Sequence, residues 1–401
     1  MITLRMQTAI HMPVDGLMFK PLKSHAYALR YRHRRDFDEF DHVVPARKLA
    51  TTRAQTGFLA MLARLLLIAL SCTPLPAHAF DYFQPLPKHV PVPKDNPLTK
   101  VKIALGKKLF FDARLSREHS HACNTCHNVT ASGADLRAVS PGANGQLTRR
   151  NAPTLWNIGF QTVLFWDGRA KSLEEQFKQH VGDAQISGDA EPNALLDRLR
   201  AIPGYVSEFK AVFHSDITLD NTAQAVASFE RSLLAPNSRF DRYMRGDKTA
   251  LNAQELRGME EFRTVECLSC HFGVNFAGPA PGPALHMGDG FYELFPNHPG
   301  SVYDASHHIA DDLGVFEFDR DPAHQRLWRV PPLRNIALTA PYFHNGSART
   351  LEEAVRIMAK VQLKKELSDQ QVADLVAFLN SLTGRLPKIT PPRLPANPSL
   401  R

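Results

Sequence analysis

The sequence predicts a mainly α-helical protein with two domains that pack against each other. Apolar residues recur at helical spacing on both sides of residue 237, whereas the alternating pattern typical of strands is scarce. A five-residue motif occurs once on each side, at 123–127 and at 267–271. Pro236-Asn237 lies between the two copies and is typical of a linker. We therefore expect two helical domains, each built around one copy of the motif.

The repeated motif has the form C-x-x-C-H, which is the attachment signature of a c-type haem. In such a site the two thiols form thioethers to the haem vinyl groups, and the histidine becomes the proximal ligand of the iron. Both domains are therefore expected to be cytochrome c-like haem domains, with two covalently bound haem c groups in the chain. The residues are Cys123, Cys126 and His127 in the first copy and Cys267, Cys270 and His271 in the second.

Zinc sites and disulfides are the alternatives for these cysteines. The chain has five cysteines, and the fifth, Cys72, lies outside both motifs. A zinc site made of the other four thiolates would leave both histidines without a role. Disulfides closed within the two C-x-x-C loops would not explain the histidine after each loop either. Two haems account for every cysteine and histidine of the two motifs.

Residues 1–79 are predicted to be a leader that contains a signal peptide. Its apolar core spans about residues 58–70 and is followed by Ala77-His78-Ala79, an A-x-A site, so cleavage is expected after Ala79. The apolar run is too short to span a bilayer, so we expect no stable membrane anchor. Haem is attached covalently on the outer side of the cytoplasmic membrane, and the predicted location is therefore the periplasm.

The positive charge of the chain belongs mostly to this leader. Residues 1–79 hold 11 of the 48 Lys and Arg residues and 5 of the 40 Asp and Glu residues, so they carry +6 of the net charge of +8. The rest of the chain is close to neutral. Net charge therefore gives no support to a nucleic-acid partner, and we expect none.

Residues 80–237 are predicted to form the N-terminal domain, which carries the first haem. A proline-rich arm covers 80–99, and 128–150 is expected to be a loop because glycine, serine and proline gather there. Apolar residues at helical spacing predict helices over 99–111, 173–180, 192–199 and 218–234.

Residues 238–390 are predicted to form the C-terminal domain, which carries the second haem, and 391–401 is a tail. A helix over 253–262 leads into the second motif, and a long loop rich in Gly, Pro and His is expected over 272–331. Two further helices are predicted over 351–361 and 369–382. The loop histidines are expected to be solvated rather than bound to iron: His286, His298, His307, His308 and His324.

Longer motifs surround the two haem motifs. They are Leu105-Gly106-Lys107-Lys108-Leu109-Phe110-Phe111-Asp112, Arg150-Asn151-Ala152-Pro153-Thr154, Phe165-Trp166-Asp167-Gly168-Arg169-Ala170 with Leu173-Glu174-Glu175-Gln176, and Pro332-Leu333-Arg334-Asn335 with Ala340-Pro341-Tyr342-Phe343-His344-Asn345-Gly346. In this order they resemble the motifs of the bacterial di-haem cytochrome c peroxidase family, which includes MauG, over most of residues 97–385. The resemblance implies a peroxide-reacting N-terminal haem and an electron-receiving C-terminal haem. It also implies hydrogen peroxide as the substrate, a small cytochrome c or cupredoxin as the electron donor, and a homodimer.

The resemblance also assigns roles to single residues. Met358 resembles the sixth ligand of the C-terminal haem, where a thioether stabilises ferrous iron and raises its potential. MauG-like members carry tyrosine at this position, so Met358 favours the peroxidase branch; the alternative is that Met358 only packs on a helix face. Trp166 resembles the aromatic residue that carries electrons or holes between the haems, and it would also be a core residue.

A calcium site is implied by the same resemblance. Asn151, Thr339 and Pro341 resemble residues that hold one calcium ion between the domains through side-chain and backbone oxygens. The alternative is local: Asn151 caps a turn, and residues 339–341 are only a loop.

The sequence departs from the family on the distal side of the first haem. In many members a loop histidine caps the resting iron, but the equal offset from His127 falls on Ala143, which cannot bind iron. Either this haem is open or another group fills the place. We expect an open, high-spin first haem that needs no reductive activation.

The distal pair of the family is only half present. Gln176 matches the distal glutamine, but Ile186 stands where the distal glutamate is expected, and that carboxylate normally shuttles a proton during cleavage of the O–O bond. His180, one helical turn after Gln176, could take over the acid–base role of the missing glutamate, or could even be a sixth ligand of the iron. The alternative for His180 is a surface histidine. Asp183 and Glu191 are further candidates.

Three functions remain open on these observations. The first is a periplasmic peroxidase that uses the catalytic residues Gln176, His180 and Trp166. The second is a MauG-like enzyme that oxidises a protein partner. The third is a di-haem electron carrier or sensor without turnover, which the missing distal carboxylate favours.

Overall fold

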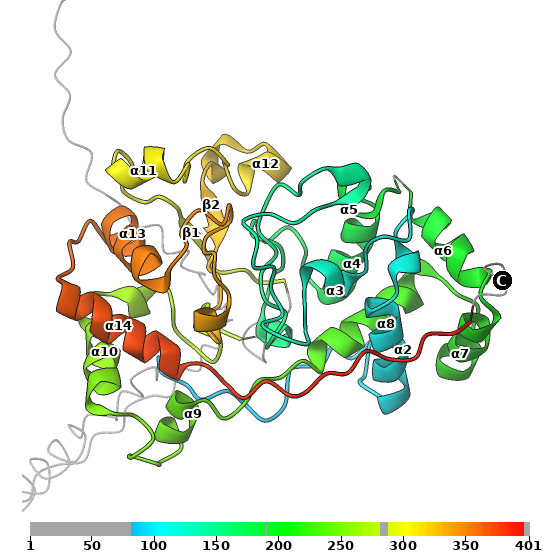
Figure 1. Ribbon diagram of the computed structural model, residues 1–401, viewed down its shortest axis with the longest axis horizontal. Coiled ribbons are helices and arrows are strands. Elements are labelled where there is room, and N and C mark those ends of the chain that lie inside the picture. The colour runs from blue at the N-terminus through cyan, green and yellow to red at the C-terminus, as the bar shows by residue number, and fades with distance from the viewer. Residues whose placement is uncertain (1–81, 190, 281–287, 397–401) are drawn as a thin grey trace, which may run out of the picture. The chain divides into compact units, whose positions relative to one another are not determined.

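The computed structural model describes residues 82–189, 191–280 and 288–396 of the 401-residue chain (Figure 1). These residues belong to one compact unit, Pro76–Arg401. This part of the chain is mainly helical, which confirms the predicted fold class, and its only sheet has two strands. Every helix in the described part falls short of the length and hydropathy that crossing a bilayer requires. The predicted signal peptide, Ala79, Cys72 and His286 lie outside the described residues.

The first half surrounds the first C-x-x-C-H motif, and its buried side chains form one hydrophobic cluster from Leu105 to Ala235. The predicted helices are present, although the one expected over 218–234 ends at Arg231. The helix that follows Ile202 was not predicted, although it begins with a proline, which is well suited to a first helical position. The helices are α2 Lys100–Phe110, α3 Cys123–Cys126, α4 Leu173–Val181, α5 Ala184–Ser187, α6 Pro192–Arg200, α7 Pro203–Phe213 and α8 Leu219–Arg231.

The second half surrounds the second motif, and its cluster runs from Phe240 to Leu382. The long loop expected over 272–331 is not purely irregular, because it contains two short helices and the antiparallel strand pair β1–β2. The elements are α9 Arg239–Met244, α10 Ala253–Thr264, β1 Tyr292–Leu294, α11 Val302–Ser306, α12 Phe316–Asp319, β2 Leu327–Arg329, α13 Leu351–Leu363 and α14 Asp369–Ser381.

Side-chain caps define where the main helices begin. In each case a serine or threonine oxygen accepts a hydrogen bond from a backbone N–H of the first turn, which satisfies a donor that has no partner inside the helix. Such caps begin α2, α4, α8, α13 and α14, and they are Thr99, Ser172, Thr218, Thr350 and Ser368.

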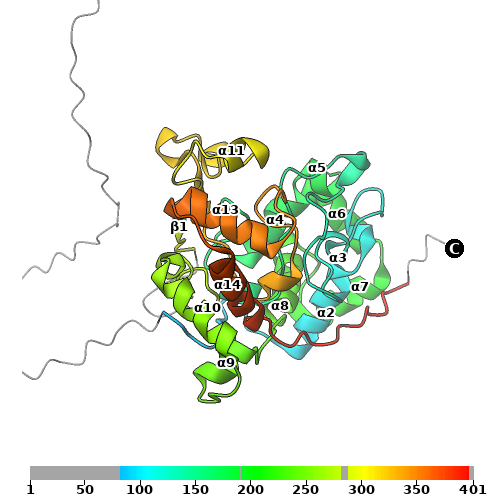
Figure 2. The same cartoon turned by 60° about the vertical axis from the view of Figure 1, so that its left-hand side comes forward.

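Each half contains one tight crossing of two helices, and a glycine makes it possible. A Cβ added at Gly106 on α2 would lie 1.8 Å from the backbone oxygen of Ala225 on α8. A Cβ added at Gly258 on α10 would lie 1.8 Å from the backbone oxygen of Asp374 on α14. Figure 2 shows both pairs side by side. Each haem motif therefore follows a helix that is pressed against the last long helix of its half.

The two halves exchange their terminal segments. Phe83, before α2, packs into the hydrophobic cluster of the second half. In the opposite direction, Leu386 and Ile389 after α14 pack against the cluster of the first half, and Arg114 donates a hydrogen bond of 3.0 Å to the backbone oxygen of Pro395. Figure 1 shows this tail, in red, running from α14 to α7. Unfolding of either half would therefore remove packing from the other.

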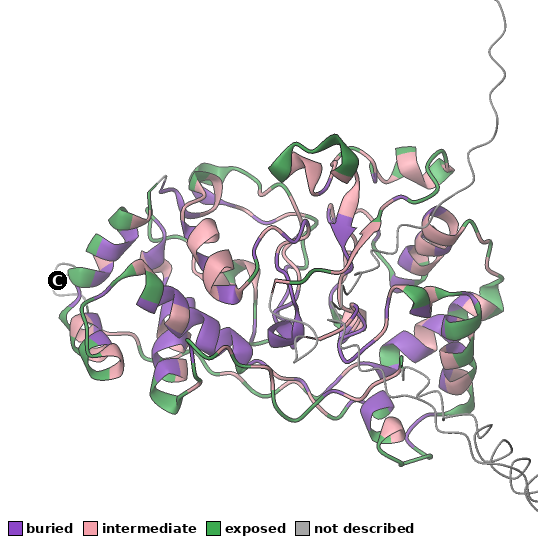
Figure 3. Cartoon of the chain, turned by 180° about the vertical axis from the view of Figure 1, so that it is seen from behind, coloured by how far each residue is buried: buried purple, intermediate pink, exposed green. Residues whose placement is uncertain are grey.

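The interior of the first half is organised by α8, which is buried along almost its whole length (Figure 3). Two charged side chains of this helix, Glu230 and Arg231, are among its buried residues. Glu230 also lines the first cavity.

Candidate haem sites

Each C-x-x-C-H motif opens into its own cavity. The first cavity, of about 470 Å³, is lined by Cys123, Cys126 and His127 on one side and by residues of α4 and α5 on another. The second, of about 210 Å³, is lined by the corresponding residues of the second motif and by α13. The larger first cavity suits a centre that admits a small molecule beside its cofactor.

The two motif histidines are oriented in the same way. Nδ1 of His127 lies 2.9 Å from the backbone oxygen of Pro153, and Nδ1 of His271 lies 2.9 Å from that of Phe276. A carbonyl oxygen only accepts, so Nδ1 carries the proton in each ring and Nε2 keeps its lone pair. Burial lowers the pKa of both imidazoles, which keeps them neutral. Each ring is therefore prepared to bind a metal through Nε2.

The four motif cysteines fit thioether formation better than a zinc site. None is in a disulfide in the described part of the chain, and the two motifs face different cavities. Burial raises the pKa of Cys123 and of Cys267 to about 12, so neither is a ready thiolate ligand. No group of three or more His, Cys, Asp and Glu side chains that could hold a metal ion occurs among the described residues. The donor set fits two c-type haems, one in each cavity.

The helix α4 and the segment after it line the first cavity with the residues expected on its distal side. Gln176 and His180 both line the cavity, as do Asp183 and Ile186 from the next turn. The position of the expected glutamate therefore faces the cavity but carries only an aliphatic side chain. Glu191 instead precedes α6 and does not line the cavity, so it is not a substitute.

His180 is not the surface histidine that the sequence left open. Its Nδ1 is buried without a hydrogen-bond partner among the described residues, and its ring stacks on Phe165 with centroids 6.5 Å apart. Burial, with smaller contributions from His127 and Arg169, lowers its pKa to about 3. The imidazole is therefore neutral at pH 7. Ala143, by contrast, is buried and lies outside the cavity lining.

The second cavity has a sulfur atom in place of these polar groups. Met358 on α13 lines it together with His271. The described loop histidines do not line either cavity, and three of them pair with carboxylates instead. The four are His298, His307, His308 and His324.

The two cavities share a wall. Asn151, Pro153, Trp166 and Arg329 line both of them. Trp166 is fixed by a hydrogen bond of 2.8 Å from its Nε1 to the backbone oxygen of Asn151. Since Pro153 also accepts the hydrogen bond from His127, the wall is connected directly to the first proximal histidine.

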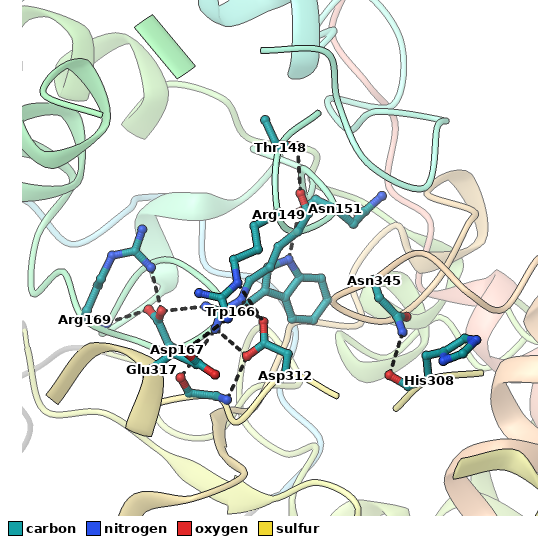
Figure 4. A network of polar contacts seen from close by, with 12 residues as sticks. Thr148, Arg149, Asn151, Trp166, Asp167, Arg169, His308, Asp312, Glu317 and Asn345 are labelled. Carbon is teal, nitrogen blue, oxygen red and sulfur yellow. Dashed lines mark hydrogen bonds and ion pairs between the residues drawn. The ribbon is translucent and has the colours of Figure 1, made fainter. Parts of the chain in front are cut away.

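An ion-pair network holds this wall across the two halves (Figure 4). Arg150 donates to Asp167 at 2.5 Å and to both carboxylate oxygens of Asp312 at 2.8 Å. Arg169 also donates to Asp167, at 2.6 Å, and its guanidinium lies 3.6 Å from the centre of the Phe165 ring. These charges are largely buried, so the network fixes the segment of Trp166 relative to the second half.

Two buried charged residues at the cavities were not identified from the sequence. Glu230 lines the first cavity; burial raises its pKa to about 8, and one of its oxygens has no partner among the described residues. Arg329 lines both cavities and donates to the backbone oxygen of Phe165 at 2.8 Å and to Gln161 at 2.5 Å. Neither lies near a haem motif in sequence, so spacing gave no signal.

The three residues expected at a calcium site line the same cavity. Asn151, Thr339 and Pro341 all line the second cavity. The side-chain nitrogen of Asn151 donates to the backbone oxygens of Arg137 and Ala138, which turns its Oδ1 the other way. An amide oxygen and backbone carbonyls are ligands that suit Ca²⁺, although this set contains no carboxylate.

Comparison with known proteins agrees with this geometry. The profile of the family described as "Di-haem cytochrome c peroxidase" matches residues 100–249, and the profile described as "Cytochrome c" matches residues 255–383. The chain is 40% identical to the cytochrome c551 peroxidase of Pseudomonas aeruginosa over 318 residues, which cover 79% of this chain and 88% of that one.

Other relatives include MauG proteins. The methylamine utilization protein MauG of Methylorubrum extorquens is 34% identical over 77% of this chain and 86% of its own length. Among solved structures, a MauG-like protein associated with microbial copper homeostasis is similar with a TM-score of 0.65 and 30% identity, over 75% of this chain and 95% of that one.

Proposed function

The chain belongs to the bacterial di-haem cytochrome c peroxidase and MauG family, and we propose that it reduces hydrogen peroxide to water with electrons from small redox proteins. The observation that best supports this function is that two cavities, which share Trp166, differ in their lining residues. One is lined by Gln176 and His180 together with His127, and the other by Met358 together with His271. A peroxidase needs this division, because one centre must admit the oxidant while the other feeds it electrons.

Two haems, held at His127 and His271, would supply the redox chemistry: reaction with peroxide in the first cavity and uptake of electrons in the second. The chain holds them through Cys123 and Cys126 in the first cavity and Cys267 and Cys270 in the second. Met358 is the proposed sixth ligand in the second cavity, where a thioether favours the ferrous state.

Gln176 and His180 are the residues that act on peroxide. The amide of Gln176 can donate to one peroxide oxygen and hold the molecule in the cavity. The neutral imidazole of His180 can accept the proton of the attacking oxygen and return it to the departing one, which is the role of an acid–base catalyst. In this way His180 replaces the carboxylate missing at Ile186. The Phe165 ring, which stacks on His180, lines the same cavity.

Electrons reach the first cavity through the shared wall. Trp166 is the aromatic residue that lines both cavities, and its indole is fixed at Nε1. We assign it the role of electron conduit. One calcium ion at Asn151, Thr339 and Pro341 would stiffen the same wall. Removing it with a chelator should lower activity, and Ca²⁺ should restore it.

The proposed setting is the periplasm, and the proposed donor is a small cytochrome c or a cupredoxin. The name of the Pseudomonas aeruginosa relative, cytochrome c551 peroxidase, supports a c-type cytochrome as the donor. A homodimer and cleavage of the signal peptide after Ala79 are proposed on the same family grounds.

A MauG-like oxidation of a protein partner is the second candidate, because MauG proteins are among the relatives. Met358 argues against it, since MauG-like members carry tyrosine there. A carrier or sensor without turnover is the third candidate, and the missing distal carboxylate is its support.

Peroxide consumption by the haem-loaded protein, with a reduced small c-type cytochrome as donor, separates these functions. The peroxidase predicts catalytic oxidation of the donor in proportion to the peroxide added. A covalent product on a co-purified protein, without donor oxidation, would support the MauG-like function instead. The absence of any turnover would support the carrier.

A further inference from the structure

A segment of the first half recurs in the second half. Phe165-Trp166-Asp167-Gly168 corresponds to Phe343-His344-Asn345-Gly346, and Leu173-Glu174-Glu175 corresponds to Leu351-Glu352-Glu353. The spacing is constant, because 343 minus 165 and 351 minus 173 both give 178. No residue is inserted or deleted between the two correspondences, so the repeat can be extended position by position into both helices.

The two copies have the same backbone conformation before the helix. Phe165 and Phe343 have positive φ angles of 63° and 72°, a conformation that is rare for bulky residues. The glycines three positions later also have positive φ, 70° at Gly168 and 62° at Gly346. An isolated antiparallel bridge closes each turn, Leu164 with Ala170 and Tyr342 with Ala348.

The two copies also start their helices in the same way. Ser172 accepts a hydrogen bond from the backbone N–H of Glu175 at 3.1 Å, and Thr350 accepts one from that of Glu353 at 3.2 Å. In return the carboxylates of these glutamates accept from the backbone at Lys171, 2.8 Å, and Arg349, 2.6 Å. The first helical residues are Leu173 in α4 and Leu351 in α13.

His180 and Met358 are therefore structurally equivalent, since 358 minus 180 is also 178. Each is the eighth residue of its helix, and each lines the cavity that its own proximal histidine lines. An imidazole reaches at least as far from its Cα as a thioether does. If the sulfur atom of Met358 can reach an iron bound at His271, a ring nitrogen of His180 can reach an iron bound at His127.

We propose that His180 is the sixth ligand of the first haem iron in the resting protein, as Met358 is for the second. Its Nδ1 is buried and has no hydrogen-bond partner among the described residues, so the ring is not committed to another group of the chain. It would occupy the axial place that Ala143 cannot fill. The open, high-spin centre expected from the sequence is then replaced by a closed one, which peroxide enters when the imidazole swings away and becomes available as a base.

The test is the spin state of the first haem in the oxidised, haem-loaded protein, measured by electron paramagnetic resonance. The wild type should show two low-spin ferric haems. In His180→Gly the first haem should become high-spin, and added imidazole should restore a low-spin signal. In His180→Met the first haem should remain low-spin but acquire the His/Met ligation of the second.

Cyanide binding gives a second readout that does not require activity. If the open form makes up about 1–10% of the resting protein, the apparent affinity for cyanide should rise about 10–100-fold in His180→Gly. His324→Ala is the matched control, because this exposed histidine pairs with Asp319 and lines neither cavity. It should leave the spectra and the cyanide affinity unchanged.

A high-spin first haem in the wild type, unaltered by His180→Gly, would overturn the proposal. So would a low-spin first haem that persists in His180→Gly without imidazole. The inference depends on the two haems but not on peroxide turnover, so the two proposals fail separately. A protein without peroxidase activity can still show this ligation, and an active one can lack it.

Discussion

Arg231 on α8 donates hydrogen bonds of 2.5 and 2.7 Å to the two carboxylate oxygens of Glu174 on α4. The guanidinium is fully buried, and Asn96 donates to the same carboxylate at 2.6 Å. Glu174 stands only a few residues before Gln176 and His180. The ion pair therefore joins α4, which lines the first cavity, to the buried helix α8.

Loss of this ion pair should destabilise the protein and disturb the position of α4 at the first cavity. Arg231→Met leaves a buried carboxylate unpaired, so we expect the free energy of unfolding to fall by about 3–5 kcal/mol. The measurement is denaturant unfolding of the haem-loaded protein, followed by the haem absorbance. Lys178→Gln is the control, since Lys178 and Asp220 also join α4 to α8 but are exposed. Its effect should stay below about 1 kcal/mol, and equal effects would contradict the account.

The same ion pair predicts a loss of stability in acid. Burial alone would raise the pKa of Glu174, but the hydrogen bonds and charge of Arg231, with the hydrogen bond from Asn96, outweigh it and lower the pKa below the ordinary 4.5. A carboxyl with a depressed folded-state pKa stabilises the protein above its unfolded pKa, and this contribution is lost as pH falls through the folded one. Unfolding at a series of pH values should show a decline below about pH 4.5 that is smaller in Glu174→Gln. An unchanged decline would contradict the assignment.

Substitution of the glycine at each helix crossing should destabilise mainly the half that contains it. Gly106→Ala places a methyl group against α8, and Gly258→Ala places one against α14, so each should cost about 1–3 kcal/mol or more by overpacking. Gly182→Ala is the control, because the nearest atom to its added Cβ is 3.4 Å away. We expect Gly106→Ala to alter mainly the spectrum of the first haem and Gly258→Ala that of the second. Equal effects of all three substitutions would refute the crossings.

Arg329 differs from the other buried arginines of the described chain. Arg231 pairs with Glu174 and Arg334 pairs with Asp241, but Arg329 has no carboxylate at ion-pair distance among the described residues. A buried guanidinium needs a counter-charge. Because Arg329 lines both cavities, the propionate groups of bound haems would supply one.

Removing this charge should favour the oxidised state of both haems. In Arg329→Gln both midpoint potentials should fall, each by about 59 mV for a tenfold change in the reduction equilibrium. In Arg329→Lys, which keeps the positive charge, both potentials should stay close to those of the wild type. Spectroelectrochemistry measures both haems in one titration. Arg257→Gln, which removes a half-exposed charge from α10, is the control. Unchanged potentials in Arg329→Gln would show that propionates do not pair with this residue.

Most of the fold followed from local patterns in the sequence. Helical spacing and caps such as Ser172 and Thr350 are local signals, so the main helices were predicted nearly to their ends. The strands β1 and β2 were missed because each has only three residues and its partner lies far along the chain. The exchange of Phe83 and Leu386 between the halves is a tertiary feature that no local pattern encodes.

The candidate sites were predictable where chemistry demands a fixed spacing. The C-x-x-C-H motifs identify Cys123, His127 and their counterparts directly. Arg329 and Glu230 could not be found in this way, because their importance comes from burial: Arg329 has no carboxylate at ion-pair distance, and one oxygen of Glu230 has no hydrogen-bond partner, among the described residues. The equivalence of His180 and Met358 was present in the sequence as a repeat of constant spacing. The matching turns and caps of the two copies, which only the structure shows, establish that equivalence.

The most direct test of the central claim is a titration of the haem-loaded protein with hydrogen peroxide in the presence of excess reduced small c-type cytochrome. The account predicts that two donor molecules are oxidised for each peroxide, and that a Cys267→Ala/Cys270→Ala variant, which retains the first haem but cannot attach the second, loses this donor oxidation. Donor oxidation that proceeds equally well in the variant, or that is absent from a wild-type protein carrying both haems, would contradict it.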